Sequence, residues 1–295
     1  MLDASHRACD EALMMSGTVV IGTDLSPPAS EAVRQGAAWA KARGASLTIV
    51  HVAPDDILRA LEEPAVTAAL SHRVDPIARP LGVPFEVALE AGSAHSGLVR
   101  AADRLGAALI VVGASGTDEG ALLGGTAERV VRYAHCAVLV ARTGGEGGPV
   151  LAATDFSPDA EQAVVAAVRE ARDRGVPLVL SHALHEPTSS LSLLGPLVMS
   201  PPEMPESERS ELREAARETL RTLMTAARGD GDVAVLLGPP AEAIVDHAKK
   251  IGASLVVVAT RGRTGLSRIA LGSVAEAIAK HAPCSVLAVR RSASE

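Results

Sequence analysis

The sequence predicts an α/β protein made of two tandem copies of one domain, each with a parallel sheet covered by helices. The first observation is an internal repeat, because segments of the first half recur in the same order in the second half. The second is the alternation, within each half, of short apolar runs with longer amphipathic stretches. The third is the length of 295 residues, which suits two domains of roughly 100–200 residues each.

The repeat is clearest when the two halves are compared segment by segment. Residues 18–26 read TVVIGTDLS, and residues 149–157 read PVLAATDFS. The pairs that follow are SLTIVHV with PLVLSHA, GAALIVVGASG with GASLVVVATRG, and AERVVRYAHCAVLVAR with AEAIAKHAPCSVLAVRR. Segments that recur in one order indicate that a whole domain has been duplicated.

In the second half, the apolar runs predict strands that are rich in Val and Leu on both faces, which is typical of buried parallel strands. The longer stretches have helical spacing and charged faces. This alternation implies right-handed crossovers and a sheet with helices on both sides. The predicted strands are 150–154, 177–183, 232–237, 254–259 and 285–290, and the predicted helices are 158–174, 208–228, 240–250 and 273–281.

The predicted boundary between the domains is residues 143–148, which contain four glycines and no hydrophobic residue and should form a flexible linker. The first domain is then 17–142 and the second 149–292. Residues 1–16 are an N-terminal extension, either a short helix or disordered. The Pro- and Ser-rich segment 184–207 is either a mobile flap or a tolerated surface insertion.

Composition argues against several classes of function. The net charge of −7, with one Trp, one Tyr and two Phe, leads us to expect no nucleic-acid partner. No apolar run reaches the roughly 18–20 residues that span a bilayer, and the N-terminus lacks a signal-peptide pattern. The three cysteines form neither a disulfide framework nor a metal-binding spacing. We therefore expect a soluble, cytoplasmic protein with no metal site.

Residues with chemical potential gather in the second half. Its first strand ends in Thr154-Asp155-Phe156-Ser157, its fourth runs into the ATRG of 259–262, and Gly272-Ser273 opens the last helix after a spacer of nine residues. This pattern resembles the G-x2-G-x9-G-(S/T) nucleotide motif of the universal stress protein family. Residues 261–289 are also very similar to the C-terminal signature of that family. The resemblance covers nearly the whole chain, twice.

The resemblance implies a fold and a ligand. The fold is a Rossmann-like, adenine nucleotide alpha hydrolase-like domain with five parallel strands in the order 3-2-1-4-5. The ligand is an adenine nucleotide, ATP or else ADP or AMP, at the carboxyl ends of the strands where the order reverses. Magnesium is expected to accompany a triphosphate, although no dedicated carboxylate ligand is evident. The implied site residues of the second domain are Asp155, Ala183, Ala259, Gly262, Gly272, Ser273 and Val274.

Elementary chemistry supports this assignment. Gly262 removes a side chain where the backbone would pass close to a ligand. Gly272 and Ser273 lie at a helix N-terminus, where unpaired N–H groups and the helix dipole favour an anion. By resemblance, Asp155 would contact the adenosine part and the backbone around Ala183 would face the adenine ring. The alternative for the Asp-x-Ser turns, at Asp155 and at Asp24 in the first half, is a helix cap alone.

One departure from the motif bears on binding in the second domain. Ala259 replaces the first motif glycine, and its β-carbon would cost about 1 kcal/mol if that position needs a positive φ. If the position needs only close approach, the loss could be smaller or much larger. The cluster of Arg261, Arg263 and Arg268 could compensate by neutralising phosphate charge, or could simply be solvated.

The first domain departs further from the motif. Its candidate residues are Asp24, Gly113, Gly116, Gly125 and Thr126, but the spacer before Gly125 is shorter by one residue. Aligning 127–129 with 275–277 instead makes Gly124-Gly125 the counterpart of Gly272-Ser273 and removes the hydroxyl. Asp118 and Glu119 would repel a triphosphate. We interpret this site as degenerate.

The remaining paired residues have simpler explanations. His51 and His182 end equivalent strands and could point at a ligand, but a structural role is the simpler reading. His135 and His281 lie at equivalent helix ends, where a charged imidazole suits the dipole. Cys136 and Cys284 are predicted to be small buried hydrophobes, with a redox switch as the alternative.

Three functions follow from these observations. The first is a stress-response regulatory protein that binds an adenine nucleotide mainly in the second domain, without efficient catalysis. The second is a scaffold that binds no nucleotide and acts through protein contacts. The third, a weak ATPase or transferase, rests on fold analogy alone. The resemblance also implies that strands 137–141 and 285–290 pair edge to edge across a pseudo-two-fold axis, so that one chain imitates a dimer. Protein partners and the association of two chains stay open.

Overall fold

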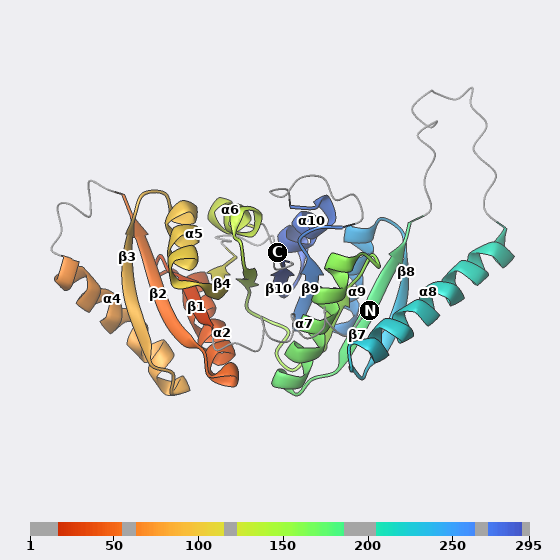
Figure 1. Ribbon diagram of the computed structural model, residues 1–295, viewed down its shortest axis with the longest axis horizontal. Helices are drawn as coiled ribbons and strands as arrows, with labels where there is room; N and C mark the ends of the chain where they lie inside the picture. Colours follow the sequence, from red (N-terminus) through yellow and green to blue (C-terminus); the bar gives the residue numbers. More distant parts are fainter. Residues whose placement is uncertain (1–16, 55–62, 115–122, 186–204, 263–270, 291–295) are drawn as a thin grey trace, which may run out of the picture.

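The computed structural model describes residues 17–54, 63–114, 123–185, 205–262 and 271–290 (Figure 1). The strands of the first half are β1 (Thr18–Gly22), β2 (Ser46–Ala53), β3 (Phe85–Ala91), β4 (Ala107–Gly113) and β5 (Ala137–Ala141). Those of the second half are β6 (Val150–Ala153), β7 (Leu178–Leu184), β8 (Asp232–Leu237), β9 (Leu255–Ala259) and β10 (Ser285–Val289). The predicted strands of the second half are therefore confirmed to within a residue or so.

These strands form one ten-stranded sheet in the order β3-β2-β1-β4-β5-β10-β9-β6-β7-β8. Each half has the order 3-2-1-4-5, and its neighbouring strands are parallel. The halves join where β5 and β10 run antiparallel, with Leu139 opposite Leu287. The α/β fold class and the pairing of the last strands are confirmed, and the two sheets are continuous.

Helices cover both faces of this sheet (Figure 1). One face carries α2 (Pro27–Arg43), α4 (Glu63–Ala78), α7 (Pro158–Arg174) and α8 (Glu206–Ala226), with a short 3-10 turn η1 (Arg79–Leu81) after α4. The other carries α5 (Ala94–Leu105), α6 (Gly125–Tyr133), α9 (Pro240–Ile251) and α10 (Ser273–His281). Within the described residues, no helix has the length and apolarity needed to cross a membrane.

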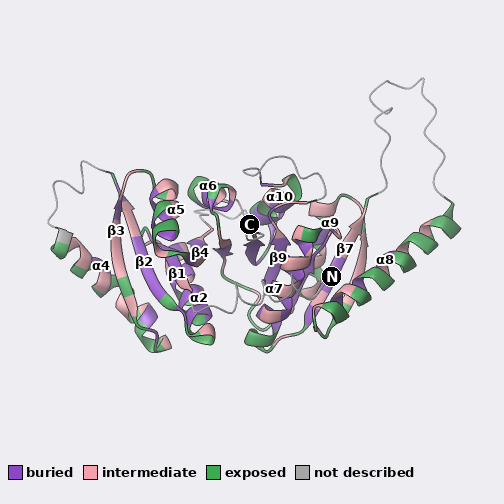
Figure 2. Cartoon of the chain, in the orientation of Figure 1, coloured by how far each residue is buried: buried purple, intermediate pink, exposed green. Residues whose placement is uncertain are grey.

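The core is aliphatic and extends through both halves, one layer on each face of the sheet (Figure 2). Leu109 and Leu255 belong to one layer, and Ile110 and Ile278 to the other, all fully buried. The outer strand β8 departs from the expectation of strands buried on both faces. It is only partly buried, and Leu237 at its end is 52% exposed, because β8 has a neighbour on one side only.

Equivalent helices of the two halves begin and end by the same devices. Ser26 and Ser157 cap α2 and α7 by accepting hydrogen bonds from Ala29 N and Ala160 N. A glycine in the left-handed conformation, Gly44 or Gly175, ends each helix. The repeat in sequence is therefore a repeat of local structure.

The glycine-rich segment 143–148 differs from the expected flexible linker. It turns against the second half, where the Ser254 hydroxyl donates a hydrogen bond to the Gly148 carbonyl at 2.7 Å. A β-carbon at Gly145 would lie 2.5 Å from the Ala253 carbonyl oxygen, and Gly145 has φ +72°. The glycines are needed here for close packing and for backbone conformation as much as for freedom of motion.

Side chains also cross between the halves on the α2–α7 face. Trp39 and Glu170 occupy equivalent positions in two 17-residue helices, and the Trp39 Nε1–H donates to Glu170 Oε1 at 2.9 Å. The Arg43 guanidinium stacks on the Trp39 ring and contacts Glu170 Oε1 at 2.8 Å and Asp173 Oδ2 at 2.7 Å. Arg174 Nε completes the cluster at 3.0 Å from Glu170 Oε2. The side chains of Arg43 and Glu170 are each only 4% exposed.

Candidate functional site

A cavity of about 290 Å³ lies at the carboxyl end of the second-half sheet, between β6 and β9. This is the point where the strand order reverses, the usual ligand position in an open parallel sheet. All seven residues predicted for the second-half site line it, namely Asp155, Ala183, Ala259, Gly262, Gly272, Ser273 and Val274. The structure thus brings together residues that are scattered over 120 positions of the sequence.

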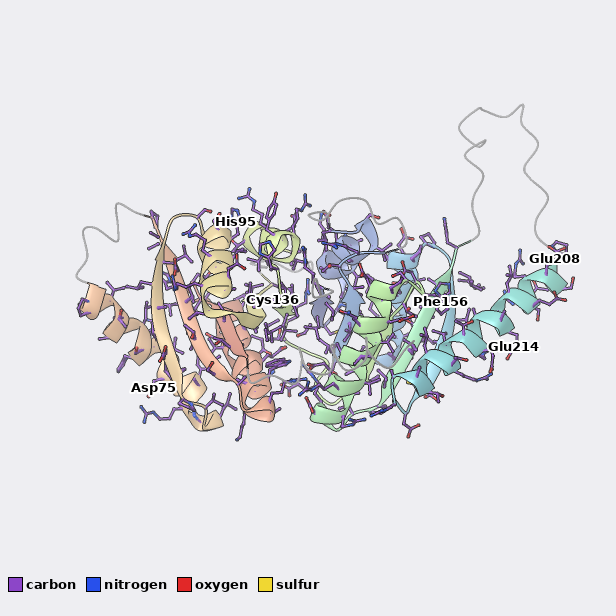
Figure 3. The ribbon with its side chains drawn as sticks, in the orientation of Figure 1. Asp75, His95, Cys136, Phe156, Glu208 and Glu214 are labelled. Atoms are coloured by element: carbon purple, nitrogen blue, oxygen red, sulfur yellow. The ribbon has the colours of Figure 1, made fainter. Side chains whose placement is uncertain are left out.

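Asp155 stands in a tight turn between β6 and α7. Its Oδ1 accepts a hydrogen bond from Ser157 N at 3.0 Å, and Thr154 Oγ1 accepts one from Phe156 N at 3.0 Å. Between them, Phe156 (Figure 3) has φ +63°, a conformation that a residue with a β-carbon rarely adopts. Ser157 caps α7, and Asp155 of the same turn lines the cavity.

Gly262 leaves room for the Asp155 carboxylate in its present position. A β-carbon at residue 262 would lie 2.6 Å from Asp155 Oδ2, well inside contact distance. Neither Gly262 nor Gly272 has a positive φ. The motif glycine at 262 therefore makes room beside the carboxylate, and backbone freedom is not the reason for it.

Ala259 ends β9 with no positive φ, so its β-carbon causes no backbone strain. The anticipated cost of about 1 kcal/mol does not arise. Its counterpart Gly113 is different, because a β-carbon there would lie 2.5 Å from the backbone of Pro28. The first glycine of the motif is thus a packing requirement in one half and is dispensable in the other.

Helix α10 points its N-terminus into the cavity. Gly272 is the N-cap residue, and among the described residues no side chain caps the helix. Gly272 N donates instead to the Thr260 carbonyl, and Ser273 to Ala275 form the wall. The first-turn N–H groups that follow carry the positive end of the helix dipole toward the cavity.

The apolar wall comes from residues that the sequence interpretation missed. Pro240 and Ile244 of α9 face the cavity, and His182 lies beside Ala183 on β7. The sequence offered a signal for Pro240 and Ile244. They lie at the start of the helix that follows the third strand, and this helix begins at the same edge of the sheet as the glycine loop. His182 Nδ1 donates to the Thr154 carbonyl at 2.7 Å, and His51 does the same to Thr23 at 2.8 Å. Both histidines hold the turn in place, as the structural reading predicted.

Of the arginine cluster, Arg261 lines the cavity, whereas Arg263 and Arg268 lie outside the described residues. Burial and then the charge of Arg261 lower the pKa of Arg290. Arg290, which follows β10, is therefore a neighbour of Arg261. Arg290 Nη2 donates to the Arg132 carbonyl of the first half at 3.0 Å. Arg132 also pairs with Glu276, in the first turn of α10, at 3.1 Å. The first half therefore touches the cation-rich side of this site.

The first half has a cavity of its own, also of about 290 Å³, at the carboxyl ends of β1 and β4. Asp24, Gly113, Gly125 and Thr126 line it, and Gly116 lies outside the described residues, as do Asp118 and Glu119. Gly124 is the N-cap of α6, as Gly272 is of α10. The counterpart of Gly272-Ser273 is therefore Gly124-Gly125, and the alignment through Gly125-Thr126 is corrected by one position.

The structure favours the thiol form of both Cys136, which is half-buried, and Cys284, which is buried. Burial raises the pKa of Cys136 to about 12 and that of Cys284 to about 11. Among the described residues, no group of three His, Cys, Asp or Glu side chains is placed to hold a metal ion. Neither a thiol switch nor a metal held by protein ligands alone has support in this part of the chain.

Comparison with known proteins agrees with this architecture. The family model described as universal stress protein matches the chain twice, over residues 15–142 and 148–290. The universal stress protein Rv2623 of Mycobacterium tuberculosis is 30% identical over 297 residues, covering 93% of this chain and 96% of the relative. YxiE of Bacillus subtilis is 33% identical over 144 residues, 48% of this chain and 97% of its own length.

A solved structure is similar in fold. The universal stress protein of Archaeoglobus fulgidus DSM 4304 superimposes with a TM-score of 0.70 at 20% identity, over 94% of this chain and 99% of its own. At that identity the likeness concerns the fold alone. The family model and the full-length relative carry the assignment, and they agree with the duplicated sheet. The chain therefore belongs to the universal stress protein family and carries the domain of that family twice.

Proposed function

We propose that this chain binds an adenine nucleotide, with ATP as the main ligand, in the second-half cavity, and that occupancy of this cavity regulates contacts with partner proteins under stress. The observation that carries the proposal is the convergence of Asp155, Gly262 and the uncapped start of α10 on one cavity. No efficient catalysis is part of the proposal.

The residues present fit the nucleoside part of such a ligand. Ala183, Pro240, Ile244 and Val258 offer an apolar wall for a planar base. Asp155 offers a carboxylate to ribose hydroxyl groups, and its position depends on the missing side chain at Gly262. A volume of about 290 Å³ suits a nucleoside, with the phosphates extending toward the mouth.

The residues also fit phosphate groups. The N–H groups of Ser273 and Val274 lie in the first turn of α10, where an anion is stabilised by the helix dipole. Arg261 on the same wall and the neighbouring Arg290 supply positive charge. Magnesium would bind mainly to the phosphates, with Asp155 as the nearest carboxylate of the cavity wall.

The open cavity favours this function over a scaffold without ligand. A scaffold was expected to have pockets that are closed or filled by side chains, and Ala259 was the sequence feature in its favour. Ala259 causes no backbone strain and leaves the cavity open.

The test is a titration of the full chain with ATP, ADP and AMP, with and without magnesium, followed by calorimetry and thermal shift. A ligand at 100 times its dissociation constant stabilises the native state by about 2.7 kcal/mol, which is a shift of roughly 5–10 °C for a domain of this size. Gly272→Asp should abolish the shift, because it places a carboxylate at the start of α10. Aspartate is a favoured N-cap residue, so the fold should tolerate the change.

Gly272→Asn is the matched control, since it has the same shape without the charge. A β-carbon at residue 272 comes no closer than 3.4 Å to the Thr260 carbonyl oxygen, so both side chains can be accommodated. We expect the asparagine variant to keep most of the affinity for ATP. Absence of binding by the wild type at millimolar nucleotide would refute the proposal and favour the scaffold.

A further inference from the structure

The two cavities of this chain are built from equivalent positions but differ in charge. Thr23, Asp24 and Ala29 of the first half correspond to Thr154, Asp155 and Ala160 of the second, and all six line their cavities. The wall helices correspond in the same way, with Ala94 and Leu98 of α5 in the places of Pro240 and Ile244 of α9. Both cavities measure about 290 Å³.

The first-half cavity retains the polar turn of the second. Asp24 Oδ1 accepts from Ser26 N at 2.9 Å, and Thr23 Oγ1 accepts from Leu25 N at 3.1 Å. Leu25 has φ +65°, which matches Phe156 at +63°. A strained conformation in a residue with a β-carbon, kept at both sites, is typical of turns that position a functional group.

The start of the wall helix is retained as well. Gly124 is the N-cap of α6, and no side chain caps that helix. Its first turn brings Gly125 and Thr126 to the cavity, so the hydroxyl lost at residue 125 reappears one position later. A β-carbon at Gly125 would meet no atom of a described residue within 4 Å.

Among the described residues, those that line the first-half cavity include no cation. Asp24 is the one charged residue among its described lining residues, whereas Asp155 shares the second cavity with Arg261. Residue 115, at the place of Arg261 in the repeat, is a serine. Burial and then the charge of Arg129 of α6 lower the pKa of His95, which is labelled in Figure 3, and Arg129 is not among the lining residues of the cavity. The equivalent of Arg290 is Arg142, whose guanidinium donates to the carbonyls of Ala279 and Cys284 in the second half.

An unbalanced carboxylate selects against phosphate. An exposed carboxylate within about 6–8 Å of a doubly charged phosphate weakens binding by roughly tenfold when both groups are solvated and the dielectric constant is that of water. A ribose hydroxyl, in contrast, donates a charge-assisted hydrogen bond to the same group. The apolar side chains of Val50, Val52 and Leu98 provide a wall for a base, as in the second cavity.

We propose that the first-half cavity is a second ligand site that takes an uncharged nucleoside and discriminates against phosphorylated nucleotides. The ligand class rests on the proposed function of the second cavity, since the nucleoside part is transferred through equivalent wall positions. The chain then holds two different ligands at once, a nucleotide in the second half and a nucleoside in the first.

The experiment is calorimetric titration of adenosine into the full chain saturated with ATP. We expect one adenosine to bind per chain, and AMP to bind the same site about tenfold more weakly. Asp24→Asn should weaken adenosine about tenfold and bring AMP to within threefold of adenosine, because asparagine can still accept from Ser26 N but carries no charge. Asp246→Asn, which removes an exposed carboxylate of α9 that lines neither cavity, should leave adenosine binding under ATP saturation unchanged.

Three outcomes would overturn the inference. They are the absence of adenosine binding, the binding of two ATP molecules per chain that exclude adenosine, and an Asp24→Asn variant whose preference between adenosine and AMP is unaltered. If ATP fails to bind the wild type, the proposed function falls separately. The adenosine titration is then carried out without ATP. The inference survives only if Asp24→Asn weakens the binding of adenosine and Asp155→Asn does not.

Discussion

The buried cluster between α2 and α7 gives the sharpest test of how the halves are held together. Glu170 accepts three hydrogen bonds, from Trp39 Nε1 and Arg43 Nη2 on Oε1 and from Arg174 Nε on Oε2. Glu170→Gln keeps the shape of this side chain, but an amide has one oxygen and two N–H donors. It therefore leaves one of the two arginines facing an N–H donor. It also removes a negative charge from a buried site, because the Glu170 side chain is only 4% exposed.

The expected loss of stability follows from the partners that remain. Breaking a buried ion pair by removing one partner costs about 3–5 kcal/mol. Asp173 still contacts Arg43 at 2.7 Å and is itself 24% exposed, so part of the charge stays compensated. We therefore expect Glu170→Gln to lower the free energy of unfolding by about 2–3 kcal/mol, below the range for a fully orphaned charge.

Trp39 makes the measurement direct, because it is the one tryptophan of the chain and belongs to the cluster. Urea unfolding followed by Trp39 fluorescence should show a lower midpoint in the variant. The control is Asp246→Asn, which breaks the exposed pair with Lys249 at 3.4 Å and should cost less than about 1 kcal/mol. Equal midpoints for the two variants would refute the idea that this cluster clamps the halves. A double change of Glu170→Leu with Arg43→Met should recover much of the loss, because it leaves neither charge buried.

Three further predictions follow from the site and from the sheet. Gly262→Ala should abolish nucleotide binding with little loss of stability, because its β-carbon would lie 2.6 Å from Asp155 Oδ2. The control is Gly125→Ala in the first half, whose β-carbon meets no described atom within 4 Å. It should leave the affinity for ATP, measured by calorimetry, unchanged. Ser285→Ala should lower the free energy of unfolding in urea by about 1–3 kcal/mol, because it removes the acceptor of Arg142 N and the donor to Gln35 Oε1. The control is Thr219→Ala on the exposed face of α8, and equal unfolding midpoints for the two variants would contradict this prediction. Cys136 and Cys284, with pKa values of about 12 and 11, should resist alkylation at pH 8 until the chain unfolds. Since both pKa values are raised, the contribution of these thiols to stability should be complete below the ordinary thiol pKa near 9 and should fall as pH rises from there toward 11–12. Rapid labelling of Cys136 or Cys284 in the native chain at pH 8, assigned by peptide mapping because Cys9 is a third thiol, would contradict this reasoning.

The repeat and the periodicity predicted most of the fold, because buried parallel strands and capped helices have local signatures. Residues 273–281 and 232–237 were predicted to the residue. The pairing of β5 with β10 came from family resemblance, since an edge strand does not reveal its partner. The contact of Trp39 with Glu170 could not be predicted, because it depends on how that pairing sets α2 against α7.

The site was predicted where it depends on glycines and on strand ends. Asp155, Gly262 and Gly272 meet because parallel strands end at one edge of the sheet. The left-handed Phe156 was not predicted, since no glycine or asparagine marks that turn. The first-half cavity was interpreted as degenerate from its spacer length. Whether such a cavity is filled depends on side chains such as Leu98, which a motif does not include.

The antiparallel pairing of β5 with β10 has a consequence for how ligand occupancy can be read. The pairing brings together the wall helices of the two cavities, because α6 contacts α10 across the seam and Arg132 of α6 pairs with Glu276 of α10 at 3.1 Å. Both helices lie on the same side of the molecule (Figure 1). A protein that docks over this seam would therefore contact the wall helix of each cavity, and one partner could respond to the occupancy of both.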